Sequence, residues 1–171
     1  MLKRSLLFFL LVLASLFSQA QFDTSFIKSN ILRNADSLTN AFKAKDWVKF
    51  TRYSYPAMVG SLGGATEFGS YISNMFSQIP DSAWKQYEPG KILQVIKTGG
   101  DYQAVVELKT IIEWEGIRST STSHLVAESW DGGYFWTFFD SQGDDKAARL
   151  IKPDLSKLIV IPPRDEKREP Y

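Results

Sequence analysis

Cysteine is absent from this 171-residue chain, histidine occurs once, and no Asn-x-Ser/Thr acceptor for glycosylation is present. Without thiols, the chain cannot form disulfide bonds, thiolate nucleophiles or cysteine-ligated metal sites. A single histidine does not supply the usual zinc ligands, so we expect no metal site and no cofactor. An excess of charge of one sign is also missing, because 20 Lys and Arg residues balance 19 Asp and Glu residues. This balance gives no electrostatic case for binding nucleic acid or an anionic membrane.

The first residues have the pattern of a secretory signal peptide. A basic start precedes an apolar run over residues 6–17, and Ser18 and Ala20 stand at the −3 and −1 positions of a cleavage site. The run is short for a helix that must cross about 30 Å of hydrocarbon, so a retained anchor is the weaker alternative. We therefore expect removal of residues 1–20 and a mature chain that is secreted or periplasmic, without membrane contact after cleavage.

The remaining chain has the length of one domain. Residues 21–163 are enough to bury a hydrophobic core. A polar linker over 141–148 leads to a last apolar run over 158–161. The final residues, 164–171, follow two prolines and are mostly charged, which predicts a frayed tail.

Three helices are predicted before residue 80. Apolar residues recur with helical spacing over 27–42 and again over 68–79, the clearest amphipathic segment. Asp46 has the position of an N-cap for a short helix that begins near Trp47. Pro56 is expected to end this short helix, because the residue before a proline is displaced from the α region.

From Trp84 onward the apolar residues alternate, which predicts strands over 84–98, 101–114, 117–130 and 134–140. Glycine-containing pairs separate these strands, and a two-residue loop at 115–116 determines the register of the second hairpin. In that register apolar pairs share one face, here called the inner face: Val106 faces Leu125, and Ala104 faces Ala127. The other, outer face carries opposite charges, which directly opposed pairs favour.

The fourth strand extends both faces. A tight turn at Gly132 and Gly133 places Ser129 opposite Trp136, Ala127 opposite Phe138 and Leu125 opposite Asp140, all on the inner face. The outer face then carries an apolar group made of Val126, Trp130, Phe135 and Phe139. Exposed apolar patches are rare on monomers, so this group favours a homodimer through the outer face, unless the run over 158–161 covers it.

Several short motifs resemble secreted bacterial members of the nuclear transport factor 2-like superfamily. They are Asp46-Trp47-Val48-Lys49-Phe50, Tyr53-Ser54-Tyr55-Pro56, Gly63-Gly64, Lys152-Pro153-Asp154-Leu155 and the ending from Leu158 to Pro162. The resemblance covers about residues 24–163 as an order of elements. It implies an α+β fold in which three N-terminal helices pack on a strongly bent antiparallel sheet, a cone that encloses a pocket. Members range from isomerases and dehydratases to binding or assembly domains, so the resemblance leaves function open.

Two titratable residues are candidates for acid–base chemistry. Asp140 is the one carboxylate that the register places on the inner face, where burial would raise its pKa. The alternative is that Asp140 lies at the end of a strand and is exposed to water. A calcium-binding loop formed with Asp144 and Asp145 is not expected, because the spacing of these residues lacks the alternating ligands of such loops. His124, the only histidine, is expected opposite Glu107 on the outer face, which favours a surface or dimer-contact role over catalysis.

Three functions follow as hypotheses. The first is a non-enzymatic domain that binds a small, largely apolar molecule against the inner face. The wall expected for this pocket consists of Leu108, Thr110, Ile112, Ser121, Ser123, Trp136 and Phe138. The second is a lyase or isomerase with Asp140 as general base. The third is an assembly module that acts through the outer face, and it would have a filled interior.

Overall fold

The computed structural model describes residues 24–171, and the predicted signal peptide lies outside the described residues. Within residues 24–171, four helices come first: α2 (Thr24–Lys43), α3 (Trp47–Tyr53), α4 (Pro56–Ser61) and α5 (Ala65–Phe76). A 3-10 turn, η1 (Asp81–Ala83), leads into strands β1 (Trp84–Thr98), β2 (Asp101–Trp114), β3 (Ile117–Ser129) and β4 (Thr137–Asp140). Helix α6 (Asp145–Ile151) and strand β5 (Asp165–Pro170) complete the chain. The predicted α+β class, with helices before an antiparallel sheet, is confirmed.

The three predicted helices correspond to α2, α3 and α5, whereas the short helices α4 and α6 were not predicted. Helix α2 buries the predicted apolar side, and the Asp46 carboxylate accepts a hydrogen bond from the Lys49 amide at 3.0 Å, as an N-cap does. Pro56 follows the end of α3 but also begins α4, which was not predicted. A proline is tolerated there because the first amides of a helix have no partner within the helix.

The predicted register of the central hairpin is confirmed along its whole length. Val106 pairs with Leu125, Ala104 with Ala127, and Glu107 with His124. The sheet has the order β1-β2-β3-β4, and β5 also pairs with β3. Strand β4 pairs with residues 125–128 and β5 with residues 117–122, so the two strands share one edge of β3.

The connection between β3 and β4 is longer than the expected two-residue turn. The β3–β4 register is as predicted, with Leu125 opposite Asp140, but β4 begins only at Thr137. The loop before it is held by Asp131, whose carboxylate accepts hydrogen bonds from the Ser129 hydroxyl and the amides of Tyr134 and Phe135. An aspartate whose side chain accepts hydrogen bonds from backbone amides a few residues ahead stabilises a turn. Here this turn takes the place of the strand pairing that was expected around Trp136.

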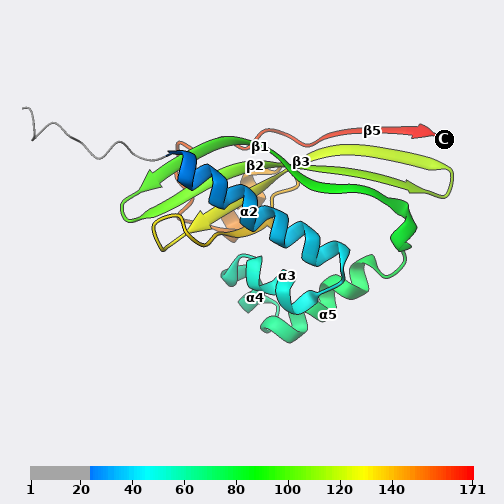
Figure 1. Ribbon diagram of the computed structural model, residues 1–171, viewed down its shortest axis with the longest axis horizontal. Coiled ribbons are helices and arrows are strands. Elements are labelled where there is room, and N and C mark those ends of the chain that lie inside the picture. The colour runs from blue at the N-terminus through cyan, green and yellow to red at the C-terminus, as the bar shows by residue number, and fades with distance from the viewer. Residues whose placement is uncertain (1–23) are drawn as a thin grey trace, which may run out of the picture.

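The main core lies between the helices and the inner face. Helix α2 crosses this face, and α3, α4 and α5 lie together at the lower side of the molecule (Figure 1). The buried side chains include Ile31 and Leu38 from α2, Phe68 from α5, and Leu108 and Trp136 from the sheet side. Every one of these five is at most 3% exposed. No helix within residues 24–171 is long and apolar enough to cross a membrane.

The outer face is covered by the chain itself. Val126 and Phe139 are at most 2% exposed and pack with Leu155, Ile159 and Ile161 from the segment after α6. This segment contains the run over 158–161, which was expected to cover the face in the absence of a second subunit, and the homodimer stays a prediction. In the apolar group of this face, Val126 and Phe139 are buried, whereas Phe135 is half-buried. Of that group, Trp130 remains 48% exposed.

The charged tail is also ordered, contrary to the expected fraying. Residues of β5 pair with β3 from Thr122↔Asp165 to Ile117↔Pro170. The sequence did not predict strand β5, because its side chains are mostly polar and exposed and show no apolar alternation.

Candidate functional site

The residues predicted to line a pocket do lie along the inner face, but much of that face is packed. Leu108, Trp136 and Phe138 are at most 1% exposed and belong to the main core. Ser121 and Ser123 are also buried, while Thr110 and Ile112 are half-buried. None of the seven residues lines any of three surface pockets on the described part of the chain, which lie beside η1, between α2 and β1, and between α3 and α5.

Asp140 lies on the inner face at the end of β4, as predicted. Its carboxylate accepts hydrogen bonds from the Gln142 amide at 2.8 Å and from the Ser123 hydroxyl at 3.0 Å. Burial raises the pKa of Asp140 above its ordinary value, although these hydrogen bonds act in the opposite direction. Burial and the nearby Asp140 charge also raise the pKa of Tyr87. None of the three pockets is lined by Asp140.

His124 faces Glu107 on the outer face, but it is not on the surface. Its side chain is buried by the C-terminal segment, and the ring hydrogen-bonds to the backbone of Pro162. Burial lowers the pKa of His124, and the nearby Glu107 and Asp140 charges oppose this effect. The expected surface or dimer-contact role is therefore corrected, because the histidine is part of the contact between the sheet and its covering segment.

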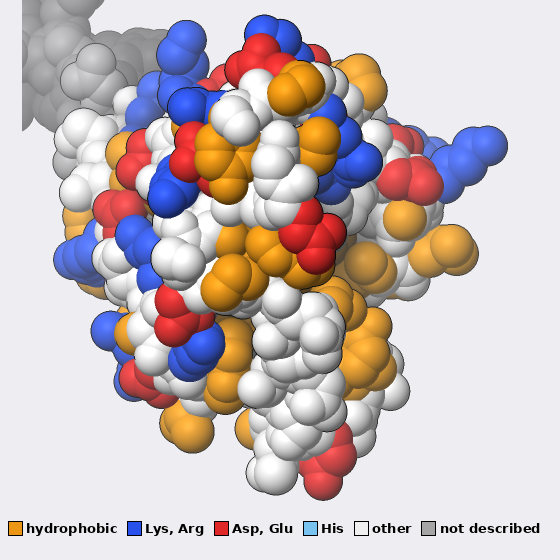
Figure 2. All heavy atoms as spheres, turned by 90° about the vertical axis from the view of Figure 1, so that its right-hand side faces the viewer, with side chains coloured by type: hydrophobic (Ala, Val, Ile, Leu, Met, Phe, Trp, Pro, Cys, Tyr) orange, Lys and Arg blue, Asp and Glu red, His pale blue; other side chains and the backbone are white. Residues whose placement is uncertain are grey.

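The candidate site with the most aromatic side chains in its lining is a pocket at the end of the helical layer, here called the aromatic pocket. Its volume is about 320 Å³. The apolar lining consists of Phe42, Trp47, Phe76, Ile79 and Trp84, and the polar lining of Lys43, Lys45, Ser73, Ser77 and Asp81. Figure 2 shows hydrophobic side chains gathered across the middle of this side of the molecule, between the sheet above and the helices below.

The aromatic side chains support one another around the pocket. The Phe42 ring meets those of Phe76 and Trp84 edge-on, with centroid distances of 5.0 Å in both cases. Phe42 also contacts Trp47 at 5.9 Å, and Trp84 contacts Phe76 at 5.6 Å. Because Phe42, Phe76 and Trp84 each contact the other two rings, this apolar wall is formed before any ligand arrives.

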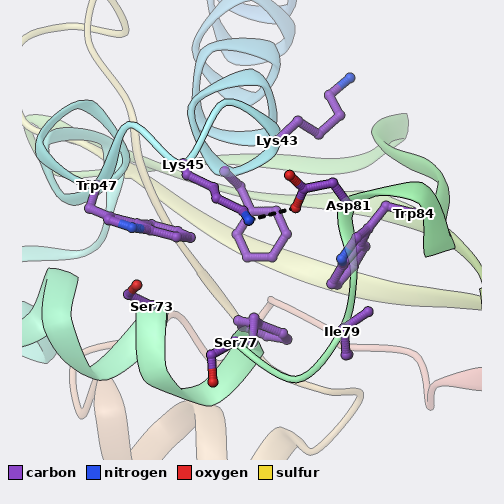
Figure 3. A pocket seen from close by; sticks show the side chains of 10 residues that line it. Lys43, Lys45, Trp47, Ser73, Ser77, Ile79, Asp81 and Trp84 are labelled. Atoms are coloured by element: carbon purple, nitrogen blue, oxygen red, sulfur yellow. Dashed lines mark ion pairs between the residues drawn. The ribbon is translucent and has the colours of Figure 1, made fainter.

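An ion pair spans the mouth of the aromatic pocket. Lys45 Nζ lies 2.6 Å from Asp81 Oδ1, and both side chains are largely exposed. Figure 3 shows the Lys45 side chain reaching across toward Asp81, with Trp47 and Trp84 on opposite sides and Lys43 pointing away. An exposed pair of this kind contributes little stability, so it can open at small cost.

Local backbone geometry places these groups. Lys45 has a φ of 54°, in the left-handed region, and its amide donates to the Phe42 carbonyl at 3.0 Å. This turn ends α2 and directs the chain into α3, so that Lys45 and Trp47 both face the pocket. On the other side, Pro80 precedes η1, which presents Asp81. The sequence indicated a turn before Trp47 and another at Pro80, but it did not indicate that the two turns lie on opposite sides of one pocket.

A second hollow adjoins the aromatic pocket along the groove between α3 and α5. We call it the hydroxyl groove; its volume is about 470 Å³. Its lining consists of Trp47, Val48, Ala65, Thr66, Gly69, Ser70, Ser73 and Asn74. A Cβ on Gly69 would lie 3.2 Å from Trp47 Cβ, so the glycine lets the two helices approach closely here.

Comparisons with protein-family models, with curated proteins and with solved structures give no significant match to this chain. Among residues 24–171, no group of three or more His, Asp or Glu side chains is arranged to hold a metal ion. The candidate site is therefore defined by its own geometry, which is an apolar pocket with a polar, exposed rim.

Proposed function

We propose that this protein is an extracytoplasmic domain that binds a small, largely apolar molecule in the aromatic pocket. The observation that carries the proposal is the pre-formed aromatic wall around a space of about 320 Å³, which is within the usual size range of ligand pockets. The polar residues at the rim are suited to orient the ligand. The extracytoplasmic location rests on the signal-peptide pattern of the first 20 residues.

The proposed site differs from the wall expected from the sequence. That wall is formed by core residues such as Trp136, whereas the aromatic pocket opens beside η1, next to an exposed ion pair. The second candidate function is a lyase or isomerase with Asp140 as general base, which is supported by the raised pKa of this carboxyl. Binding is the better-supported function, because the aromatic pocket offers space for a ligand beside its rim, while Asp140 lines none of the three pockets.

The experiment measures binding of methylumbelliferone, an uncharged fluorescent bicycle at mildly acidic pH, by fluorescence anisotropy. We expect saturable binding to the mature protein. Replacing Ile79 by Trp would fill the aromatic pocket and weaken this binding at least about tenfold, equivalent to roughly 1.4 kcal/mol.

A matched control places the same bulk elsewhere. Leu158 is 74% exposed on the covering segment, so Leu158→Trp adds an indole without touching the pocket. Circular dichroism of both variants checks that they fold. Equal affinity of Ile79→Trp and Leu158→Trp for the probe, or no binding by the unaltered protein, would contradict the proposed function.

A further inference from the structure

We propose that the aromatic pocket and the hydroxyl groove act as one elongated site, and that its ligand is a glycoside-like molecule with an apolar ring at one end and an uncharged, hydroxylated tail. This inference rests on the proposed function and extends it, because it identifies a second binding region and the chemical class that fits it.

The first observation is that the two hollows are adjacent. Trp47 and Ser73 line both of them, so the two spaces meet at these side chains. Figure 3 shows Trp47 and Ser73 beside one another at one end of the aromatic pocket. A ligand whose ring occupies the pocket can therefore continue past the Trp47 side chain into the groove between α3 and α5.

The second observation is the chemistry of the groove. Its lining contains no charged side chain, whereas the aromatic pocket has lysines and an aspartate at its rim. Thr66, Ser70 and Ser73 follow one another at intervals of four and three residues, so their hydroxyls lie along one side of α5. A row of neutral hydroxyls beside an indole suits a hydroxylated ligand, since each hydroxyl donates and accepts and the indole offers an apolar surface.

The third observation is that these hydroxyls are unused within the described part of the chain. Serines within a helix or at its C-cap commonly bond to a carbonyl one turn back, and Ser37, Ser54, Ser61 and Ser77 do so here. Thr66, Ser70 and Ser73 make no side-chain hydrogen bond to any residue in 24–171. Their bonding capacity is therefore directed to solvent or to a bound molecule.

The test compares methylumbelliferone with methylumbelliferyl cellobioside, which adds two sugar rings to the same bicycle. We expect the glycoside to bind about tenfold more tightly than the bicycle alone. Ser70 is exposed, so Ser70→Phe fills the groove without disturbing the core. This variant should remove the advantage of the glycoside and leave the affinity for methylumbelliferone unchanged. Gln78→Phe adds the same bulk at an exposed position of neither hollow and should leave both affinities unchanged.

The outcomes separate this inference from the proposed function. The elongated site is overturned if the glycoside binds no more tightly than methylumbelliferone, or if Ser70→Phe leaves the glycoside's higher affinity unchanged. Either outcome leaves the proposed binding in the aromatic pocket intact. Absence of binding by either probe overturns both. Free cellobiose, tested as a competitor, should displace the glycoside only weakly, because it lacks the apolar ring.

Discussion

The two faces of the sheet are buried in different ways. On the inner face, regular helices cover apolar side chains such as Leu108 and Leu125, and the rings of Phe42, Phe50 and Phe68 fill the space between. On the outer face, an irregular segment covers Val126 and Phe139 and brings charged groups with it. The comparison shows that the packing of the helices on the inner face follows from the local periodicity of apolar residues. The packing of the segment after α6 on the outer face depends instead on specific contacts.

The most specific of those contacts is a buried charge cluster. Lys152 is 1% exposed, and its ammonium group pairs with the Glu128 carboxylate on β3 and with Asp154 at 2.9 Å. The same ammonium lies over the Tyr55 ring, 5.5 Å from its centroid. Burial opposes the charge on Lys152, but the hydrogen bonds to Glu128 and Asp154 outweigh burial and raise its pKa. This cluster ties the covering segment to the centre of the outer face.

Removing a large ring from the inner core should have the largest effect. Trp136 is fully buried and its indole donates to the Gly133 carbonyl at 3.0 Å. Trp136→Ala should lower the free energy of unfolding by about 3 to 5 kcal/mol, because a large cavity remains, although the Gly133 carbonyl keeps its hydrogen bond from the Asn30 side-chain amide. Urea denaturation measures this loss. Trp130→Ala, at a position that is 48% exposed, is the control and should cost much less. Equal losses in the two variants would mean that the inner face is not the better-packed region.

Breaking the charge cluster on the outer face should be the next largest effect. Glu128→Gln leaves the Lys152 charge buried, and the expected loss in unfolding free energy is about 3 kcal/mol, at the lower end for such pairs because Asp154 remains. Replacing both partners, Glu128→Leu with Lys152→Met, should recover part of this loss, since no buried charge is left unpaired. Lys167→Met removes an exposed pair with Glu169 and serves as control, with an expected change below about 1 kcal/mol. A double variant less stable than Glu128→Gln would show that the pair itself holds the cover in place.

The smallest effect concerns pH and the only histidine. Burial lowers the pKa of His124 below its ordinary value, so the folded state favours the neutral ring. The stability from this group is present above the ordinary pKa of 6.5 and is lost as the pH falls through the lower folded-state pKa. We expect His124→Gln to reduce the loss of stability on acidification, measured by urea denaturation at a series of pH values. NMR titration of the single histidine measures the same shift directly, and a pKa at or above 6.5 would contradict it.

Much of the inner face could be predicted, and the candidate site could not. The spacing of Ile31 and Leu38 predicted the buried side of α2, and the tight loop at Glu115 and Gly116 predicted every pair of the β2–β3 hairpin. The aromatic pocket, in contrast, draws Trp47, Asp81 and Trp84 from three separate elements. Each residue had a local explanation, as the start of a helix, a turn or the start of a strand, and nothing local indicated that they enclose a common space.

The sequence by itself determined the α+β order, the register of the central strands and the assignment of Asp140 to the inner face, because hydrophobic periodicity and two-residue turns act over a few neighbouring residues. Only the tertiary structure decided that the segment after α6 covers the outer face, that β5 extends β3, and that Lys152 meets Glu128. Those contacts join residues that are far apart in the sequence, and they involve polar or irregular segments that show no hydrophobic period. The position of the aromatic pocket belongs to the same group, because a cavity is defined by how separate elements pack together.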